Sequence, residues 1–377
     1  MKVLLVTWNF PPRLGGAENL AYHLAASLGE IEEVTVLTGA APRAASPAAE
    51  PFRLRRAPLP RFAGFLAWLP WALGARLLGR RPDVVLVLSA PLAGLVVLPC
   101  LLLGVPRVAL VFGSDMAYGG ALYRRFLRWT LPRYRRVLAI SRHVAGLAAG
   151  LGVPPGRIDL LPPGVDPAFA AGPAAPEALP ASDAPVVLFV GRVVPRKGLG
   201  PFLRHAFPRV AERVRAELWV VGGEPSDSLA HREGELARLR GWLAADPVGQ
   251  RVRFLGRVPD EVLRAAYRRA AVLVLPAVVD ERDVEGFGIV FLEAALFGVP
   301  AVATAAGGIP DAVVDGETGL LAAPGDWEGL AGCLVRLLED GALRERLGAA
   351  ARRRAAGELA WGNIAERCSR LLHGARR

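Results

Sequence analysis

Four charged side chains in the second half of the chain have the types and spacing needed to bind a phosphorylated ligand. Arg192 and Lys197 follow the apolar run Val186 to Val190, and Glu285 and Glu293 are separated by seven residues. A guanidinium is a planar fork and an ammonium is a point charge, and both suit a diphosphate. A carboxylate accepts hydrogen bonds from two adjacent hydroxyls, such as those of a ribose. The four residues therefore predict a site for a diphosphate and a diol.

Glycines accompany these charges. Gly191 precedes Arg192, and the loop that contains Glu285 continues as Gly286-Phe287-Gly288-Ile289. The backbone N–H groups of Phe287, Gly288 and Ile289 can point at a phosphate or a sugar hydroxyl, because they lie at the start of an expected helix. Glu293 lies inside that helix among apolar residues, where a carboxylate needs a partner.

Lysine is rare in this chain, which helps to separate the cations. Lys2 and Lys197 are the two lysines among 46 basic residues, so the composition favours arginine wherever either residue would serve. Lys197 is therefore predicted to be required as a lysine. For Arg192 and Arg196 a second interpretation stays open, that they are solvated loop residues, and the loss of Arg196 should do little.

The first half of the chain offers a second set of candidates at strand ends. Gly15 and Gly16 lie between an expected strand, Val3 to Thr7, and an expected helix, Ala17 to Leu28, and Asp115 follows another strand. These three residues are expected to face a ligand cleft. The glycine turn is not a G-x-G-x-x-G sequence, and no acidic residue ends the second strand, which argues against a dinucleotide dehydrogenase.

The elements that must position these residues alternate between strand and helix, which predicts parallel sheets covered on both faces. The expected fold class is α/β, with two Rossmann-like doubly wound domains that face a cleft. Further strands are expected at Val34 to Leu37, Val84 to Leu88, Val108 to Phe112, Val137 to Ile140, Val186 to Val190, Glu217 to Val221, Val252 to Leu255, Val272 to Leu275 and Ala301 to Ala303. Helices are expected at Asp260 to Ala270 and Gly288 to Phe297.

The domain boundaries follow from a change in composition. An Ala- and Pro-rich stretch, residues 171–185, is predicted to link a first domain, 1–170, to a second, 186–360. The last segment, 361–377, is predicted to be a helix that packs back on the first domain. The first domain is expected to contact the acceptor, and the second to bind the donor.

The composition indicates in which cellular compartment the protein is expected and which kinds of site it is not expected to have. The cysteines Cys100, Cys333 and Cys368 are far apart, which indicates a reduced, cytoplasmic protein without a zinc site. The uncharged run from Val84 to Val105 is long enough to span a membrane, but prolines interrupt it. It is predicted to be a buried strand followed by a helix.

The net charge is +11, and residues 1–180 carry +9 of it. Such a basic half suggests an anionic partner, and no nucleic-acid module accompanies it. Two interpretations stay open for its arginine- and aromatic-rich segments: peripheral docking on the inner face of an anionic membrane, or core aromatics beside solvated arginines. The segments contain Phe62, Phe65, Trp68, Trp71, Tyr123, Arg124, Arg125, Phe126, Arg128, Trp129, Arg133, Tyr134, Arg135 and Arg136.

Taken together, the motifs resemble those of the retaining glycosyltransferases of the two-domain B fold, in the group similar to glycosyltransferase family 4 that includes bacterial mannosyl- and glucosyltransferases. The resemblance covers nearly the whole chain. It is carried by Gly15-Gly16, Ser141, Pro162-Pro163-Gly164-Val165-Asp166, Gly191-Arg192, Lys197-Gly198, the pair Glu285 and Glu293, Gly307-Gly308-Ile309-Pro310-Asp311 and Asp315-Gly316-Glu317-Thr318-Gly319-Leu320.

The resemblance implies transfer of a hexose from a nucleotide sugar to a glycan or lipid-linked acceptor, with retention of configuration and without a metal or cofactor. Arg192 and Lys197 would stabilise the leaving diphosphate, Glu285 would orient the sugar, and Glu293 would hold the ribose. One residue departs from the family pattern: Phe112 stands where many members have a histidine that helps to hold the transferred sugar.

Two other functions fit the same scaffold. A nucleotide-sugar epimerase would also bind a diphosphate and a diol, but the paired glutamates with the Arg/Lys pair argue against it. A non-catalytic protein that binds a nucleotide sugar or a lipid would agree with Phe112, whereas the four intact charged residues argue against it.

Overall fold

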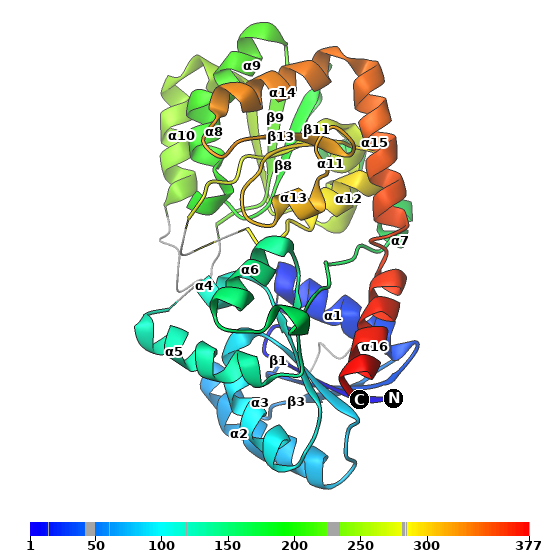
Figure 1. Ribbon diagram of the computed structural model, residues 1–377. Coiled ribbons are helices and arrows are strands. Elements are labelled where there is room, and N and C mark those ends of the chain that lie inside the picture. The colour runs from blue at the N-terminus through cyan, green and yellow to red at the C-terminus, as the bar shows by residue number, and fades with distance from the viewer. Residues whose placement is uncertain are drawn as a thin grey trace. The chain divides into compact units, whose positions relative to one another are not determined.

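The computed structural model describes residues 1–13, 15–41, 50–59, 61–117, 119–224, 234–280, 283 and 285–376. Its contacts divide the chain into two compact units. Unit 1 contains Met1–Gly164 and Leu359–Arg377, and unit 2 contains Val165–Glu358. Each unit is built around one parallel sheet (Figure 1).

In the described part of unit 1, seven parallel strands form a sheet in the order β3-β2-β1-β4-β5-β6-β7. Its inner strands are rich in Val and Leu and are almost fully buried, because helices cover both faces. The strands are β1 (Lys2–Thr7), β2 (Glu33–Thr38), β3 (Arg53–Arg56), β4 (Val84–Leu88), β5 (Arg107–Val111), β6 (Arg136–Ala139) and β7 (Ile158–Leu160). The helices are α1 (Gly16–Gly29), α2 (Arg61–Leu78), α3 (Ala90–Leu102), α4 (Ser114–Ala117), α5 (Ala121–Thr130), α6 (Arg142–Gly150) and α16 (Trp361–Arg376).

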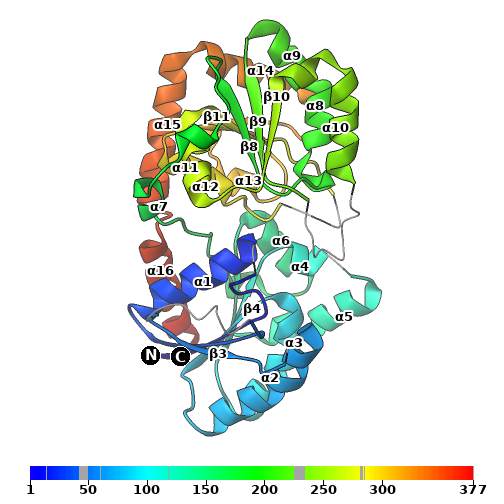
Figure 2. The ribbon, with the colours of Figure 1, turned by 180° about the vertical axis from the view of Figure 1, so that it is seen from behind.

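Six parallel strands form the sheet in the described part of unit 2, in the order β10-β9-β8-β11-β12-β13. The strands are β8 (Val186–Val190), β9 (Glu217–Val221), β10 (Val252–Gly256), β11 (Ala270–Leu275), β12 (Ala301–Thr304) and β13 (Gly319–Ala322). The helices are α7 (Ala168–Ala171), α8 (Leu199–His205), α9 (Phe207–Arg213), α10 (Glu235–Ala245), α11 (Asp260–Arg269), α12 (Val290–Leu296), α13 (Ile309–Ala312), α14 (Trp327–Glu339) and α15 (Gly341–Ala356). Seen from behind in Figure 2, the sheet lies between helices on both sides.

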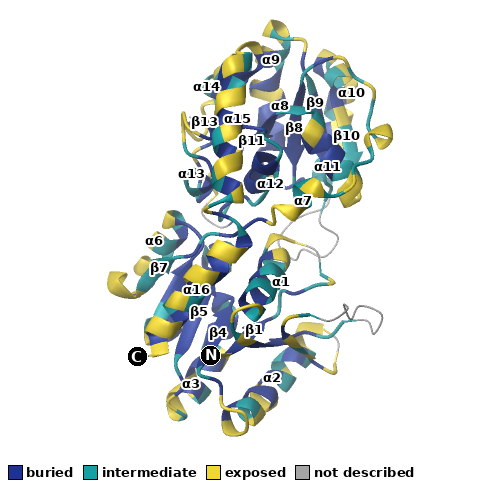
Figure 3. Ribbon diagram, turned by 90° about the vertical axis from the view of Figure 1, so that its right-hand side faces the viewer, coloured by how far each residue is buried: buried dark blue, intermediate teal, exposed yellow. Residues whose placement is uncertain are grey.

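The predicted fold class, two doubly wound parallel sheets, is confirmed. The uncharged run after Val84 is a buried strand followed by helix α3, as predicted. No helix among the described residues is both long enough and apolar enough to cross a membrane. Figure 3 shows the buried strands inside each unit and the exposed outer faces of the helices around them.

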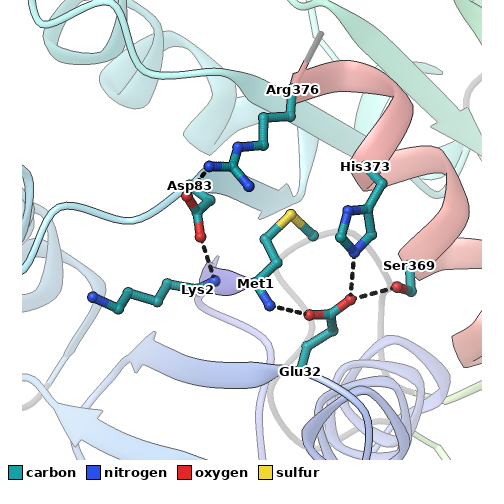
Figure 4. Close-up of polar contacts among 7 residues, drawn as sticks. All are labelled: Met1, Lys2, Glu32, Asp83, Ser369, His373 and Arg376. Atoms are coloured by element: carbon teal, nitrogen blue, oxygen red, sulfur yellow. Dashed lines mark hydrogen bonds and ion pairs between the residues drawn. The ribbon is translucent and has the colours of Figure 1, made fainter.

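Helix α16 packs on α1 in unit 1, and a small polar network holds its last turns (Figure 4). The buried carboxylate of Glu32 accepts hydrogen bonds from Ser369 Oγ at 2.5 Å and from the Met1 nitrogen at 2.5 Å, and it lies 2.9 Å from His373 Nε2. Arg376 forms a salt bridge of 3.0 Å with Asp83. These contacts join the end of the chain to the amino-terminal edge of the sheet, near β1. The predicted helix 361–377 therefore lies in unit 1 up to Arg376, and Arg377 is outside the described residues.

The segment predicted as a linker, residues 171–185, is instead an integrated part of unit 2. Helix α11 holds it through three arginines that donate to its backbone carbonyls: Arg264 to Pro173 at 2.6 Å, Arg268 to Gly172 at 3.1 Å, and Arg269 to Ser182 and Ala184 at 2.7 Å each. The boundary also moves from residue 170 to Gly164, because helix α7 packs against α12. Composition alone made this stretch look like a linker, since its large apolar residues are few.

Candidate functional site

The candidate donor site lies at the carboxyl edge of the unit 2 sheet. Strand order reverses between β8 and β11, and in open α/β sheets such a switch point is where ligands bind. The loops that follow these two strands contact each other there. The Val278 amide donates to the Arg196 carbonyl at 3.0 Å, and this hydrogen bond connects the two loops.

A tight turn brings the lysine into this edge. The short helix Pro195–Lys197 ends at Gly198, which has φ 70°. A Cβ atom at Gly198 would lie 1.8 Å from the carbonyl oxygen of Pro276, so the two loops could not approach this closely with any other residue there. Gly198 therefore makes the contact between the loops possible.

Two cations and two carboxylates form a compact cluster in these loops. Lys197 Nζ lies 2.7 Å from Glu285 Oε2, and Arg196 also forms a salt bridge with Glu285. Arg196 Nε lies 3.0 Å from Asp283 Oδ2, as an ion pair without a well-aligned hydrogen bond. The four side chains are only 9–10% exposed. The structure thus confirms that Lys197 and Glu285 are neighbours.

The interpretation of Arg196 as a solvated residue is wrong. Its guanidinium is as buried as Lys197 and bridges Asp283 and Glu285. Both partners lie almost ninety residues away along the chain, on the loop after β11. No local pattern around Arg196 could therefore have indicated them.

Burial and charge oppose each other in this cluster. Burial raises the pKa of Glu285, but the charges of Lys197 and Arg196 outweigh burial and lower the pKa to about 2. Burial lowers the pKa of Lys197, and the charges of Arg196 and Arg192 act in the same direction, whereas Glu285 opposes them. Glu285 is thus a permanent anion that holds the lysine in place.

Arg192 differs from the other cations because its side chain is exposed. It follows Gly191, whose amide donates to the Val221 carbonyl of the neighbouring strand at 2.9 Å. Since the Arg192 charge influences the pKa of Lys197, the two cations lie within electrostatic range of each other. An exposed guanidinium at the carboxyl edge, beside a buried ammonium, is suited to a diphosphate.

The glycine-broken loop before α12 contributes its backbone. The Phe287 side chain is buried, so this residue can contact a ligand only through its main chain. Among the described residues, the amides of Phe287, Gly288 and Ile289 donate to no backbone carbonyl. Gly288 has φ 91°, a conformation that favours glycine. Val284, in the same motif, lies outside the described residues.

Glu293 has a hydrogen-bond partner that is not part of the charged cluster. Its Oε2 accepts a hydrogen bond of 2.8 Å from the hydroxyl of Tyr267, a buried residue of α11. Burial raises the pKa of Glu293, the Tyr267 hydrogen bond lowers it, and Asp260 raises it further, with a net rise. The expected partner of this half-buried carboxylate is thus a tyrosine, which the sequence analysis did not single out.

Gly15 and Gly16 lie where the sequence predicted, between the carboxyl end of β1 and helix α1. Both are exposed, and no side chain caps the helix. Leu14, in the same turn, lies outside the described residues. A ligand can reach the backbone of this turn from solvent.

Two arginines at the same edge of unit 1 were not anticipated. The Arg13 guanidinium lies 3.7 Å from the ring centroid of Trp8, and Arg56 donates to the Pro11 carbonyl at 2.8 Å. Burial lowers the pKa of both arginines, and the charge of Arg13 lowers that of Arg56 as well. Two like charges therefore lie close together beside the glycine turn.

Asp115 does not offer a free carboxylate to a ligand, which corrects its predicted role. It accepts hydrogen bonds from the amides of Phe112 and Gly113 at 3.0 Å each and of Ala90 at 2.8 Å. These bonds join the loops after β4 and β5. Asp115 is therefore a positioning residue for this edge, because its oxygen atoms are already engaged.

The described residues contain no group of three or more His, Cys, Asp or Glu side chains that could hold a metal ion. Arg196 and Lys197 supply positive charge at the switch point.

Solved structures share this fold over almost all of the chain. Sucrose-phosphate synthase from Thermosynechococcus elongatus has a TM-score of 0.78 and 23% identity, covering 99% of this chain and 98% of that one. HepE of Anabaena, in complex with UDP and glucose, has a TM-score of 0.77 and 18% identity, covering 99% of this chain and 100% of that one. These matches show a GT-B fold.

Two family models together span most of the sequence. The model of "Glycosyltransferase Family 4" matches residues 14–169, and that of "Glycosyl transferases group 1" matches residues 174–354. A GDP-mannose-dependent alpha-(1-6)-phosphatidylinositol monomannoside mannosyltransferase of Mycolicibacterium smegmatis is 32% identical over 99% of both chains. A D-inositol 3-phosphate glycosyltransferase of Frankia alni is 38% identical over 54% of this chain and 50% of its own length. The charged switch-point site lies in the part of the chain that the group 1 model matches. Because the mannosyltransferase of Mycolicibacterium smegmatis is similar to this chain from end to end, the chain belongs to the glycosyltransferases of family 4.

Proposed function

We propose that this glycosyltransferase moves a hexose from a nucleoside-diphosphate sugar to a lipid-linked acceptor, with retention of configuration and without a metal ion. The observation that carries the proposal is the cation and carboxylate cluster at the switch point of unit 2. A leaving nucleoside diphosphate develops negative charge in the transition state, and preorganised cations beside it stabilise that charge.

Each residue has a separate task in this proposal. Lys197 and Arg192 contact the diphosphate, Glu285 holds the ammonium in position, and Arg196 in turn holds the Glu285 carboxylate. The backbone at Gly191 leaves room for the ligand, and the free amides of Phe287, Gly288 and Ile289 bind phosphate or sugar oxygens. Glu293 binds the ribose diol, and Tyr267 keeps its carboxylate oriented.

We propose GDP-mannose as the donor. The relative that matches over 99% of both chains has GDP-mannose in its name. Solved neighbours of the same fold bind UDP and UDP-glucose, so the base has to be tested directly. The lipid-linked acceptor is supported by the same relative, whose name contains a phosphatidylinositol mannoside. Gly15 and Gly16, with Arg13 and Arg56 at the same edge of unit 1, form the acceptor side.

A donor screen tests this proposal. GDP-mannose at about 100 times its dissociation constant is expected to stabilise the chain by about 2.7 kcal/mol, which thermal unfolding measures. GDP-glucose differs from GDP-mannose in the sugar alone, and UDP-mannose differs from it in the base alone, so these two compounds are the matched donors. Turnover in the presence of a chelator should equal turnover without it, and the product anomer should keep the donor's configuration. Loss of turnover with the chelator, or inversion of the anomer, would contradict the proposal.

An exposed apolar surface on unit 1 supports docking on an anionic membrane. Helix α3 packs between α2 and α5. Trp71, Leu102 and Leu122, on these three helices, are 72%, 85% and 82% exposed. The arginines Arg124, Arg125 and Arg128 are exposed on α5, the helix that carries Leu122. We call this the apolar–arginine surface, and its composition suits an interface with anionic lipid.

Some aromatic side chains of these segments agree with membrane docking, and others agree with the interpretation as core residues. Phe62 and Trp71 of α2 and Phe126 and Trp129 of α5 are exposed, which agrees with membrane docking. Phe65 and Tyr134 are fully buried core residues. Arg133, Arg135 and Arg136 follow α5 and line a separate pocket. The surface proposed for docking is thus smaller than the sequence segments that suggested it.

Replacing Leu102 and Leu122 with glutamate is expected to weaken binding to vesicles that contain phosphatidylglycerol, because it places negative charge at the lipid contact. Sedimentation with vesicles at low salt measures binding, which should also fall as salt rises. Ile31→Glu is the matched control, since Ile31 is 48% exposed in the turn after α1. If the double variant bound vesicles as well as this control does, the docking surface would be wrong.

A further inference from the structure

An arginine-lined cavity occupies the other edge of the unit 1 sheet. It has a volume of about 470 Å³ and is lined by residues that precede or begin β5, β6 and β7, together with the last turns of α16. Arg107 and Arg136 are the first residues of their strands, and Arg157 comes immediately before β7. In a parallel sheet these positions lie at the amino edge, whereas Gly15, Gly16 and Asp115 lie at the carboxyl edge. The cavity is therefore separate from the candidate acceptor side.

Positive charge dominates this cavity. Its lining contains five arginines: Arg107, Arg133, Arg135, Arg136 and Arg157. Within the described part of the chain, one carboxylate forms a salt bridge with them, Asp159, which lies 3.1 Å from Arg136. Arg376 of α16 is nearby in sequence to the lining residues Gly374 and Ala375, but it is paired with Asp83 (Figure 4). The arginines of the cavity thus lack most of the negative charge that would balance them.

Backbone carbonyls hold several of these side chains in place. Arg107 donates to the Arg133 carbonyl, Arg133 donates to the Trp129 carbonyl, and Arg157 donates to the Pro132 carbonyl at 3.1 Å. Such bonds orient a guanidinium without neutralising its charge. The remaining N–H groups are available to an acceptor that brings negative charge with it.

Arg107 is a second, independent observation that indicates a ligand site in this cavity. It is 8% exposed, and its Nε atom is buried without a hydrogen-bond partner. Burial lowers the pKa of Arg107, and the charge of Arg135 lowers it further, against the opposing effects of Cys100 and Tyr134. Burying a guanidinium with one unpaired N–H is costly, and an anion in the cavity would offset part of the cost of the buried charge.

We propose that this cavity, which we call the arginine pocket, binds a phosphate-bearing anion. Guanidinium groups form paired hydrogen bonds with phosphate oxygens, and several of them converge here. The volume lies within the range of sites for small molecules, so it has room for a diphosphate or a phosphorylated headgroup. The pocket is independent of the donor site, because its residues belong to unit 1.

Pyrophosphate is the probe that tests the pocket, and calorimetry measures its binding. Titrations are made with the full chain carrying Lys197→Met, which weakens the diphosphate site of unit 2. The test variant adds Arg135→Gln and Arg157→Gln, because both residues are exposed and the fold does not depend on burying them. The control adds Arg55→Gln and Arg80→Gln instead, which removes the same charge from exposed residues of unit 1 outside the pocket.

The test variant is expected to bind pyrophosphate about tenfold more weakly than the control, or weaker still, since two charge-assisted contacts are lost. A second arm uses phosphatidylglycerol vesicles. If the test variant and the control bind vesicles equally, the ligand is a soluble phosphate compound. If the test variant binds vesicles more weakly than the control, and pyrophosphate displaces the control from vesicles, the ligand is a lipid headgroup. Equal pyrophosphate affinity in test and control variants, or no binding to either, would overturn the proposal.

Discussion

Replacing Lys197 with methionine is expected to lower turnover about 10²- to 10³-fold, the usual effect of removing one group that stabilises developing charge. Methionine keeps an unbranched apolar stem in the buried site but removes the ammonium group. Glu285 keeps Arg196 as a partner, so the variant should stay folded. Steady-state turnover with GDP-mannose measures the effect, and a thermal melt checks the fold.

Lys2→Met is the matched control for this experiment. Lys2 is the other lysine of the chain, and its side chain is exposed in the first strand of unit 1. The same chemical change there should leave turnover unaltered. If Lys197→Met had the turnover of wild type, or if both variants lost it equally, the ammonium group would have no part in the reaction.

Replacing Arg196 with methionine is expected to lower the free energy of unfolding by about 3–5 kcal/mol, because it breaks a buried ion-pair network by removing one partner. Asp283 and Glu285 would both lose their contact with the guanidinium, and the side chain of each is only 10% exposed. Urea unfolding measures the change. The additional substitution Asp283→Asn should restore part of the stability, since it removes a buried carboxylate left without this partner.

Arg209→Met is the control for Arg196, since Arg209 is an exposed arginine of the same unit. Its loss should change the unfolding midpoint little. The contrast should hold at every pH above the ordinary pKa of a glutamate, 4.5, because the pKa of Glu285 is lowered to about 2. A lowered carboxyl pKa adds stability above the unfolded value, and that stability is lost as pH falls toward 2. Equal unfolding midpoints for the two variants would show that Arg196 is the solvated residue its sequence suggests.

Local pattern was enough to predict the elements that build the site. Three strands have the predicted bounds in the structure: Val84 to Leu88, Val186 to Val190 and Glu217 to Val221. Three edge strands were missed: β3 is half-buried and arginine-rich, β7 has only three residues, and β13 has only four. A buried strand can be predicted from its run of apolar residues, whereas a short edge strand has no such run.

The candidate site was predicted in part for the same reason. Lys197 and Glu285 were found because each follows an identifiable strand, and parallel strands bring their carboxyl ends to one edge. The roles of Arg196 and Asp115 were mistaken, since they depend on partners rather than on position. Asp115 is engaged by amides from two loops, and one of them, at Ala90, comes after a different strand, β4.

The sequence by itself determined the two parallel sheets, the edges at which ligands can bind, and the identity of the charges placed there. Only the tertiary structure decided which of those charges are paired. It joined Arg196 to Asp283 and Glu285, attached residues 171–185 to α11, and gathered Arg107, Arg133 and Arg157 around one cavity. The physical reason is that periodicity and composition report local burial along the chain, whereas charge pairing depends on the order of strands in a sheet, which brings distant segments together.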